Sequence, residues 1–125
     1  MKILIVDDSL MDRKLLCNAL TKNGITNEVL QASNGEEGLK MLSTQYDEIC
    51  LVLLDWQMPV VDGIQFMKGA LADPETAKIP IVMITASGSE DNKRQAREVN
   101  PSLAGYIVKP YKIQMLVDTI KPYIK

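Results

Sequence analysis

Histidine is absent from this 125-residue chain, and the chain holds only two cysteines, one tryptophan and one phenylalanine. Without an imidazole the chain has no histidine-based acid–base catalyst and no histidine ligand for zinc. Cys17 and Cys50 lie in apolar contexts without metal-type spacing, so we expect two reduced, buried thiols. The formal net charge is only −2, with 14 basic residues, which gives no basic field for nucleic acid.

Long hydrophobic runs are missing as well. No run approaches transmembrane length, and the four apolar residues of Ile3–Val6 are too few for a signal peptide. We therefore expect a cytoplasmic protein with no membrane association. The length suits one well-filled core, and no linker or repeat marks a second domain, so residues 1–125 are expected to form a single domain.

Short apolar runs that end in polar residues are the main feature that is present. In Ile49–Leu54 six apolar residues lead directly into Asp55, which is typical of a strand buried on both faces of a parallel sheet. Ile3–Val6 has the same form and ends in Asp7-Asp8. The three other expected strands are Glu28–Ala32, Ile79–Ile84 and a short one over Tyr106–Val108 that could begin at Ala104.

Amphipathic stretches alternate with these strands and predict five helices. Their expected bounds are about Leu10–Lys22, Gly35–Ser43, Gly63–Ala72, a Ser87–Glu90 capping box continuing to Val99, and Ile113–Tyr123. A polar loop is expected from Asp73-Pro74. The apolar residues expected to face inward on the first and last helices are Met11, Leu15, Leu16, Ala19, Leu20, Ile113, Leu116, Val117 and Ile120. The alternation predicts an α/β fold, with a parallel sheet, helices on both faces and right-handed crossovers.

Four of the five strands end in a polar signature, namely Asp7-Asp8, Asp55, Thr85 and Lys109. The carboxyl ends of parallel strands meet at one edge, so we expect these groups to converge. Three clustered carboxylates require a compensating cation, which Lys109 supplies in part and Mg²⁺, a cation that prefers oxygen ligands, would complete. A carboxylate in this setting can attack phosphorus and form an aspartyl phosphate, with Thr85 adding a hydroxyl donor.

Each of these residues also has an ordinary structural interpretation when it is taken alone. An aspartate at a strand end commonly forms a turn, and Asp8 could simply cap the first helix. Thr85 could be a plain strand residue, Lys109 a solvated charge, and Asp62-Gly63 a turn that starts a helix. The functional interpretation depends on the recurrence of all four signatures at the same edge.

The motifs D-D, L-L-D-x-x-M-P-x-x-D-G, I-T-A and V-K-P together resemble the receiver domain of two-component response regulators, the CheY-like family. The resemblance covers Lys2 to Lys125 and implies a flavodoxin-like (βα)5 fold with strand order 2-1-3-4-5. It implies that Asp55 is the phosphoacceptor and that Lys109 pairs with the phosphoryl group. The implied Mg²⁺ ligands are Asp55, Asp8, the backbone carbonyl of Gln57, and Asp7 either directly or through water.

The resemblance implies two conformational features. The Lys109–Pro110 peptide bond would be cis, as is usual in this family. Thr85 and Tyr106 would form the switch pair, in which the hydroxyl moves toward the phosphate and the ring turns inward. The alternative for Tyr106 is a half-buried aromatic residue on an edge strand.

The resemblance further implies a signalling function, without turnover of a separate substrate and therefore not as an enzyme. A sensor histidine kinase or histidine phosphotransfer protein would modify Asp55, and an effector would read the change on the face of the fourth helix, fifth strand and fifth helix. No output domain is expected, so the chain resembles single-domain regulators that act as a chemotaxis-type output or as a relay intermediate. Neither nucleic acid nor a membrane is an expected partner; a monomer and a weak dimer both stay open.

The stretch from Thr85 to Tyr106 departs from the family pattern, because it looks longer and ends its helix at Asn100-Pro101. Few apolar residues, chiefly Ala96 and Val99, would hold this helix to the sheet. We predict a loosely attached helix that offers Lys93, Arg94 and Arg97 to an acidic partner, the alternative being an ordinary solvated face. Rival functions for the whole chain are a phosphorylation-independent pseudo-receiver, an aspartate-nucleophile phosphatase and a flavin mononucleotide binder.

Overall fold

Five parallel strands form one sheet in the order β2-β1-β3-β4-β5. The computed structural model describes all 125 residues. The strand bounds are β1 (Lys2–Val6), β2 (Val29–Ala32), β3 (Ile49–Leu54), β4 (Ile81–Thr85) and β5 (Gly105–Val108). The expected flavodoxin-like α/β fold and its strand order are therefore confirmed.

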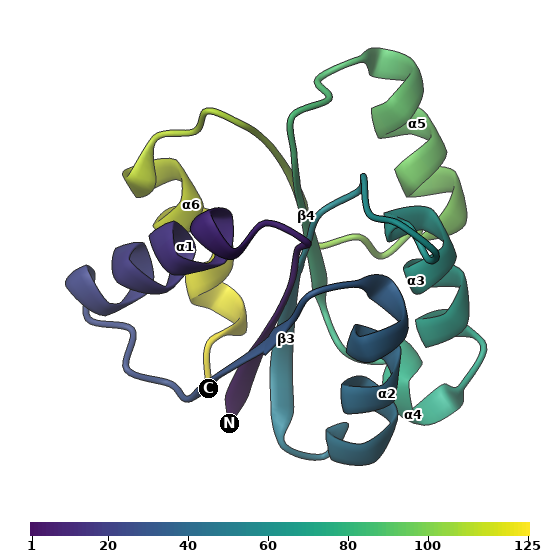
Figure 1. The fold of residues 1–125 in the computed structure, drawn as a ribbon, viewed down its shortest axis with the longest axis horizontal. Coiled ribbons are helices and arrows are strands. Elements are labelled where there is room, and N and C mark those ends of the chain that lie inside the picture. The colour runs from purple at the N-terminus through teal and green to yellow at the C-terminus, as the bar shows by residue number, and fades with distance from the viewer.

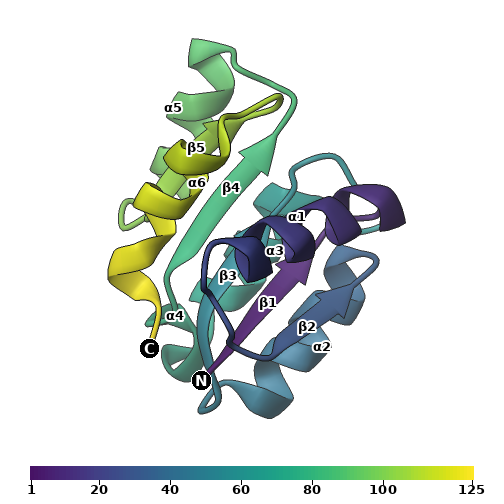
Figure 2. The ribbon, with the colours of Figure 1, turned by 90° about the vertical axis from the view of Figure 1, so that its left-hand side faces the viewer.

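Helices cover both faces of this sheet. On one face lie α1 (Leu10–Lys22) and α6 (Ile113–Ile120), the latter continuing into a 3₁₀ turn, Lys121–Tyr123. On the other lie α2 (Gly35–Gln45), α3 (Gly63–Leu71) and α5 (Glu90–Val99), with the short α4 (Pro74–Ala77) after α3 (Figure 1). Figure 2 shows that all strands run in the same direction, so their carboxyl ends lie along one edge. None of the helices combines the length and apolar character needed to span a membrane.

The two faces of the sheet explain why the central strands read as continuous apolar runs. Along β1, Leu4 and Val6 join the core beneath α2, α3 and α5, whereas Ile3 and Ile5 join the core beneath α1 and α6. Because successive side chains point to opposite faces, a strand that is buried on both needs an apolar residue at every position. Phe66, the single phenylalanine, is fully buried in the first of these cores.

The start of α5 differs from the predicted capping box. The N-cap is Ser89, whose side chain accepts the backbone N–H of Asn92 at 3.1 Å. The Ser87 hydroxyl instead accepts the side-chain amide of Asn92, so Ser87 holds the loop in front of the helix and does not cap it. The expected Ser87–Glu90 box is therefore wrong, whereas the expected end of the helix at Val99 is correct.

A second difference is the short helix α4, where the sequence predicted a polar loop. Asp73 caps it by accepting the backbone N–H of Glu75, and Pro74 occupies its first turn, where a missing N–H is tolerated. Thr76 is buried, and its hydroxyl donates to the carbonyl of Ala70 at the end of α3. This hydrogen bond anchors the segment to the end of α3, a contact that the sequence pattern alone does not reveal.

Three residues expected to face inward are exposed: Met11 at 71%, Leu15 at 58% and Ile113 at 43%. The helical period lets Leu16 and Leu20 contact the sheet, and it places Leu15 about 100° around the helix from Leu16. Leu15 and Ile113 line a cavity between α1 and α6. The expectation for the cysteines also needs one correction: both are free, but Cys17 is only half-buried.

Candidate functional site

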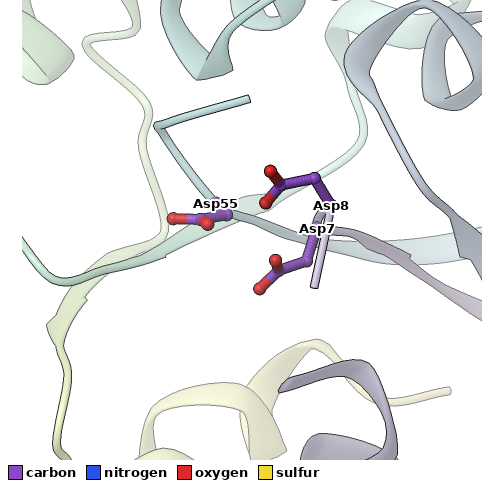
Figure 3. Close-up of side chains that lie close together, drawn as sticks. All are labelled: Asp7, Asp8 and Asp55. Atoms are coloured by element: carbon purple, nitrogen blue, oxygen red, sulfur yellow. The ribbon is translucent and has the colours of Figure 1, made fainter. Parts of the chain in front are cut away.

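Three carboxyl groups lie together beyond the ends of two neighbouring strands. Asp7 and Asp8 follow β1, and Asp55 follows β3, which pairs with β1 through Val6 and Leu54. One ligand oxygen from each aspartate lies within 4.8 Å of the others, and Figure 3 shows the three side chains gathered at the strand ends. Asp7 is buried, Asp55 is half-buried and Asp8 is exposed, so the cluster opens to solvent on the Asp8 side.

Asp55 has one carboxylate oxygen that is fixed and one that is not. Its Oδ1 accepts the backbone N–H of Trp56 at 2.8 Å, whereas its Oδ2 lies 3.8 Å from Lys109 Nζ, too far for a hydrogen bond. Burial raises the pKa of Asp55 from its usual 3.8 to about 6; Lys109 opposes this increase, and the charge on Asp7 adds to it. At neutral pH the group is therefore mainly ionised, with a free oxygen beside a cation.

Lys109 reaches the cluster from the loop after β5, where its backbone N–H donates to the carbonyl of Thr85 at 2.8 Å. The Lys109–Pro110 bond is cis, as expected. The ammonium donates to Asp7 Oδ2 at 3.1 Å and to Asp12 Oδ2 at 2.9 Å. Burial by itself would lower the pKa of Lys109, but the hydrogen bond that its ammonium donates to Asp12 and the charges of Asp55 and Asp7 raise it to about 12.

Asp12 was not among the residues predicted for the site. It lies in the first turn of α1, where an acidic residue usually needs no further explanation. Its partner Lys109 is 97 positions away in the chain, and no local motif links the two. Only the packing of α1 beside the loop after β5 reveals the contact.

The donor set suits a hard cation such as Mg²⁺, because it consists of carboxylate oxygens without nitrogen or sulfur ligands. Asp8 and Gln57 line the same pocket, of about 400 Å³, which is open to solvent. Asp7 Oδ1 accepts the backbone N–H of Ser9 at 2.9 Å, and Asp7 Oδ2 accepts from Lys109. Both carboxylate oxygens of Asp7 therefore already accept a hydrogen bond.

The loop between β3 and α3 keeps Asp55 and Trp56 close to the start of α3. An added Cβ at Gly63 would lie 2.7 Å from the Asp55 carbonyl oxygen, so only glycine fits there. Asp62 precedes it and forms a reciprocal capping box with Gln65. Within the same loop, Val60 has a φ of 69° and an exposed fraction of 79%, an unusual backbone conformation for a β-branched residue.

Thr85 and Tyr106 meet at Ser87. The Thr85 Oγ1 accepts the backbone N–H of Ser87 at 3.3 Å, and the Tyr106 hydroxyl donates to the Ser87 carbonyl at 2.7 Å. Asn92, in the first turn of α5, donates to the Ser87 side chain. The structure places no contact between the Thr85 hydroxyl and Asp55, but it does connect the end of β4 with β5 and α5 through one residue. Sequence reasoning had expected Ser87 to cap the helix and had not predicted this connection.

A cavity of about 470 Å³ lies on the α1 and α6 side of the cluster. Asp7, Asp12, Asp55 and Lys109 form its polar end. The rest of the lining is mainly apolar and includes Ile5, Val6, Leu15, Leu16, Leu53, Leu54, Ile84, Pro110, Tyr111 and Ile113. The acid cluster is therefore reached both from the Asp8 pocket and from an apolar cleft.

The comparisons with known proteins agree with this geometry. The family "Response regulator receiver domain" matches residues 3–121. The chain is 37% identical over 123 residues to the phosphate regulon transcriptional regulatory protein PhoB of Pseudomonas aeruginosa, and it spans 51% of that relative's length. It is 35% identical over 122 residues to the chemotaxis protein CheY of the same organism, covering 97% of this chain and 94% of that one.

Solved structures of the same type superpose on the fold. The chemotaxis protein CheY4 of Vibrio cholerae has a TM-score of 0.84 at 29% identity, with 98% of this chain and 97% of that chain covered. A chain in the CheX-CheY-BeF3-Mg+2 complex of Borrelia burgdorferi has a TM-score of 0.86 at 27% identity, with 100% of this chain and 90% of that chain covered.

Proposed function

This chain belongs to the receiver domains of response regulators, and from that premise we propose that it accepts a phosphoryl group on Asp55. The donor is a phosphohistidine on a sensor histidine kinase or on a histidine phosphotransfer protein, and the step depends on Mg²⁺. The observation that supports this most directly is the unbonded Asp55 Oδ2, which lies 3.8 Å from the Lys109 ammonium within a cluster of three carboxyl groups.

In the transfer, Asp55 Oδ2 attacks phosphorus, the P–O bond forms, and the P–N bond to the donor imidazole breaks, leaving the electron pair on nitrogen. Asp8, Asp55, the carbonyl of Gln57 and Asp7 through water would hold the cation, which offsets charge on the phosphoryl oxygens. Lys109 supplies a further positive charge 3.8 Å from Asp55 Oδ2. The structurally similar CheX-CheY complex from Borrelia burgdorferi contains beryllofluoride and Mg²⁺, which supports the same assignment here.

The change in partner binding begins at Thr85. Its Oγ1 accepts from the Ser87 backbone, so its own hydrogen is free to donate to a phosphoryl oxygen. Movement of Thr85 toward Asp55 would disturb the Ser87 peptide, which also holds the Tyr106 hydroxyl, while the Ser87 side chain holds Asn92. We propose this route, Thr85 through Ser87 to Tyr106 and α5, as the switch.

The surface that changes is formed by α5, β5 and α6, where a downstream effector would bind. On α5, Lys93 and Arg94 pair with acidic residues one turn earlier, Glu90 and Asp91, and Arg97 is exposed. Only Ala96 is buried on this helix. A helix with so little apolar anchoring can shift at low cost, and its basic side chains suit an acidic partner.

The wider setting follows from the same proposal. The protein acts as a signalling module that supplies groups for its own modification and turns over no separate substrate. We propose a cytoplasmic location, which is supported by two free cysteines, and we propose that residues 1–125 form one receiver domain that is monomeric or weakly dimeric. Capture of partners on beryllofluoride-loaded protein would distinguish the two roles. Capture of a direct effector would indicate a chemotaxis-type output, and capture of a second histidine phosphotransfer protein would indicate a relay intermediate.

The decisive experiment is the intact mass of the protein after incubation with acetyl phosphate and Mg²⁺. We expect the gain of one phosphoryl group in wild type, no gain in Asp55→Asn and no gain when Mg²⁺ is chelated. If wild type gains nothing while remaining folded, the chain is a pseudo-receiver that works by binding alone. Steady hydrolysis of a general phosphoester would point to a phosphatase, and a yellow purified protein to a flavin binder.

A further inference from the structure

The ammonium of Lys109 is closer to Asp12 than to the proposed phosphoacceptor. Its Nζ lies 2.9 Å from Asp12 Oδ2, 3.1 Å from Asp7 Oδ2 and 3.8 Å from Asp55 Oδ2. Asp12 is outside the group of three aspartates that could share a metal ion. Lys109 is therefore shared between the acid cluster and a carboxylate on the neighbouring helix.

The position of Asp12 is fixed by the start of α1. Its backbone N–H donates to the Ser9 side chain at 3.2 Å, which is the N-cap bond of this helix. Arg13, the next residue, donates to the Asp7 carbonyl and so ties the first turn of α1 to the end of β1. Asp12 consequently faces Lys109 from a rigid element and not from a mobile loop.

We propose that Asp12 is a positioning residue that competes with Asp55 for the Lys109 ammonium and thereby weakens binding of a phosphoryl group at Asp55. This inference rests on the function proposed above. The phosphoryl group carries about −1.5 to −2 charges in place of the single charge of the ionised Asp55 carboxylate, and Lys109 must turn toward it to form a hydrogen bond. The contact with Asp12 is given up in that movement.

The solvent exposure of Asp12 allows this exchange to be reversible. Its side chain is 41% exposed, against 12% for Asp55 and 8% for Asp7. Water can hydrate a carboxylate this accessible when Lys109 leaves it. Loss of the Lys109–Asp12 ion pair therefore costs only the small free energy that a partly exposed ion pair contributes. That contribution corresponds to a change of about two- to fivefold in an equilibrium constant, which is large enough to measure.

The experiment measures two affinities by the fluorescence of Trp56, the single tryptophan, whose backbone N–H binds Asp55. One is the affinity for beryllofluoride at saturating Mg²⁺, and the other is the affinity for Mg²⁺ alone. In Asp12→Asn we expect beryllofluoride to bind about two- to fivefold more tightly, because Lys109 is no longer shared. We expect Mg²⁺ alone to bind more weakly, since the ammonium then stays closer to Asp7 and Asp55.

Two variants serve as controls. Glu36→Gln removes an acidic residue from the first turn of α2, where Glu36 is exposed and forms no ion pair, so both affinities should stay at the wild-type values. Asp12→Glu keeps the carboxylate and should stay close to wild type in both. Circular dichroism confirms that each variant is folded, and a merely structural role of Asp12 would not move the two affinities in opposite directions.

The outcomes separate this inference from the proposed function. Unchanged or weaker binding of beryllofluoride in Asp12→Asn overturns the role of Asp12, while tight binding by wild type leaves the receiver function standing. If wild type binds no beryllofluoride in the presence of Mg²⁺, both are overturned.

Discussion

In the body of the sheet, the stretches Ile3–Val6 and Ile49–Leu54 are at most 5% exposed, whereas directly after them the same strands bring three carboxyl groups within 4.8 Å. The body consists of apolar side chains that are buried on both faces. The carboxyl edge consists of charged groups, including Lys109 with three acidic neighbours, and of a loop in which Val60 has a positive φ. Two regions built from the same strands thus follow opposite rules.

The two regions contribute to the stability of the protein with opposite signs. Burial of apolar groups stabilises the body of the sheet. Crowded charge and backbone strain at the carboxyl edge lower the stability, as is common where residues are arranged for function. Substitutions that remove a native feature should therefore destabilise the protein in the body and stabilise it at the edge. The sign of each effect tests the comparison.

The largest effect is expected in the body, at Phe66. This side chain is fully buried among α2, α3 and the sheet, so Phe66→Ala should lower the free energy of unfolding by about 3–5 kcal/mol, measured by urea denaturation. As a control, Met115→Ala on α6, where Met115 is 47% exposed, should change it by about 0.5 kcal/mol or less. A loss at Phe66 no larger than that of the control would contradict the comparison.

The next effect is at the edge, and its sign is opposite. Because the pKa of Asp55 rises from 3.8 to about 6 on folding, the folded protein retains a proton between these pH values that the unfolded chain has lost. Stability contributed by protonated Asp55 is thus lost as the pH rises through this window. A shift of about 2 units corresponds to about 3 kcal/mol, so Asp55→Asn should be more stable than wild type at pH 7 by about 2–3 kcal/mol.

The measurement is urea denaturation of both proteins from pH 3.5 to pH 8 in Mg²⁺-free buffer. The advantage of Asp55→Asn should disappear below about pH 4, where Asp55 is protonated in both states. A difference that does not change with pH would exclude a charge effect and point to packing.

A smaller gain is expected at Val60, in the loop after β3. Its φ of 69° is unfavourable for a β-branched residue, and its side chain is 79% exposed, so Val60→Gly should raise the free energy of unfolding by about 1 kcal/mol. Gly24 provides the converse control: it has a φ of 79° and no atom within 4 Å of an added Cβ. Gly24→Ala should lower the free energy of unfolding by about 1 kcal/mol through its backbone conformation alone. Changes in this free energy with the same sign in Val60→Gly and Gly24→Ala would refute the argument.

The smallest effect compares two helices on the same face of the sheet. Five residues of α3 are buried but only Ala96 of α5, so amides of residues 94–99 should open at a free energy about 1 kcal/mol lower than those of α3. Native-state hydrogen exchange measures both in one sample. Equal protection of the two helices would show that α5 is an ordinary solvated helix and would remove the loose attachment from the proposed switch.

Much of the fold could be predicted because its signals are local. The apolar runs, the bounds of α1 and the convergence of four strand ends follow from side-chain periodicity and from the parallel direction of the strands. The short α4 could not be predicted, since the anchor at Thr76 reaches back to Ala70. The exposure of Met11 and Leu15 was also missed. Periodicity predicts the direction in which a side chain leaves the helix, but it does not predict how far the neighbouring elements extend to cover that side chain.

The apolar runs, taken as parallel strands, predicted that the acids lie together at the carboxyl edge, because regular structure carries each strand-end residue to a known place. The strand order and the phosphoacceptor role of Asp55 were implied by the resemblance of the motifs to receiver domains. The hydrogen-bond partners of Lys109, and the role of Ser87 in joining Thr85 to Tyr106, became visible only in the folded structure. These contacts depend on side chains that lie far apart in the chain, such as Asp12 and Lys109. No sequence pattern shows that Lys109 lies 2.9 Å from Asp12 but 3.8 Å from Asp55.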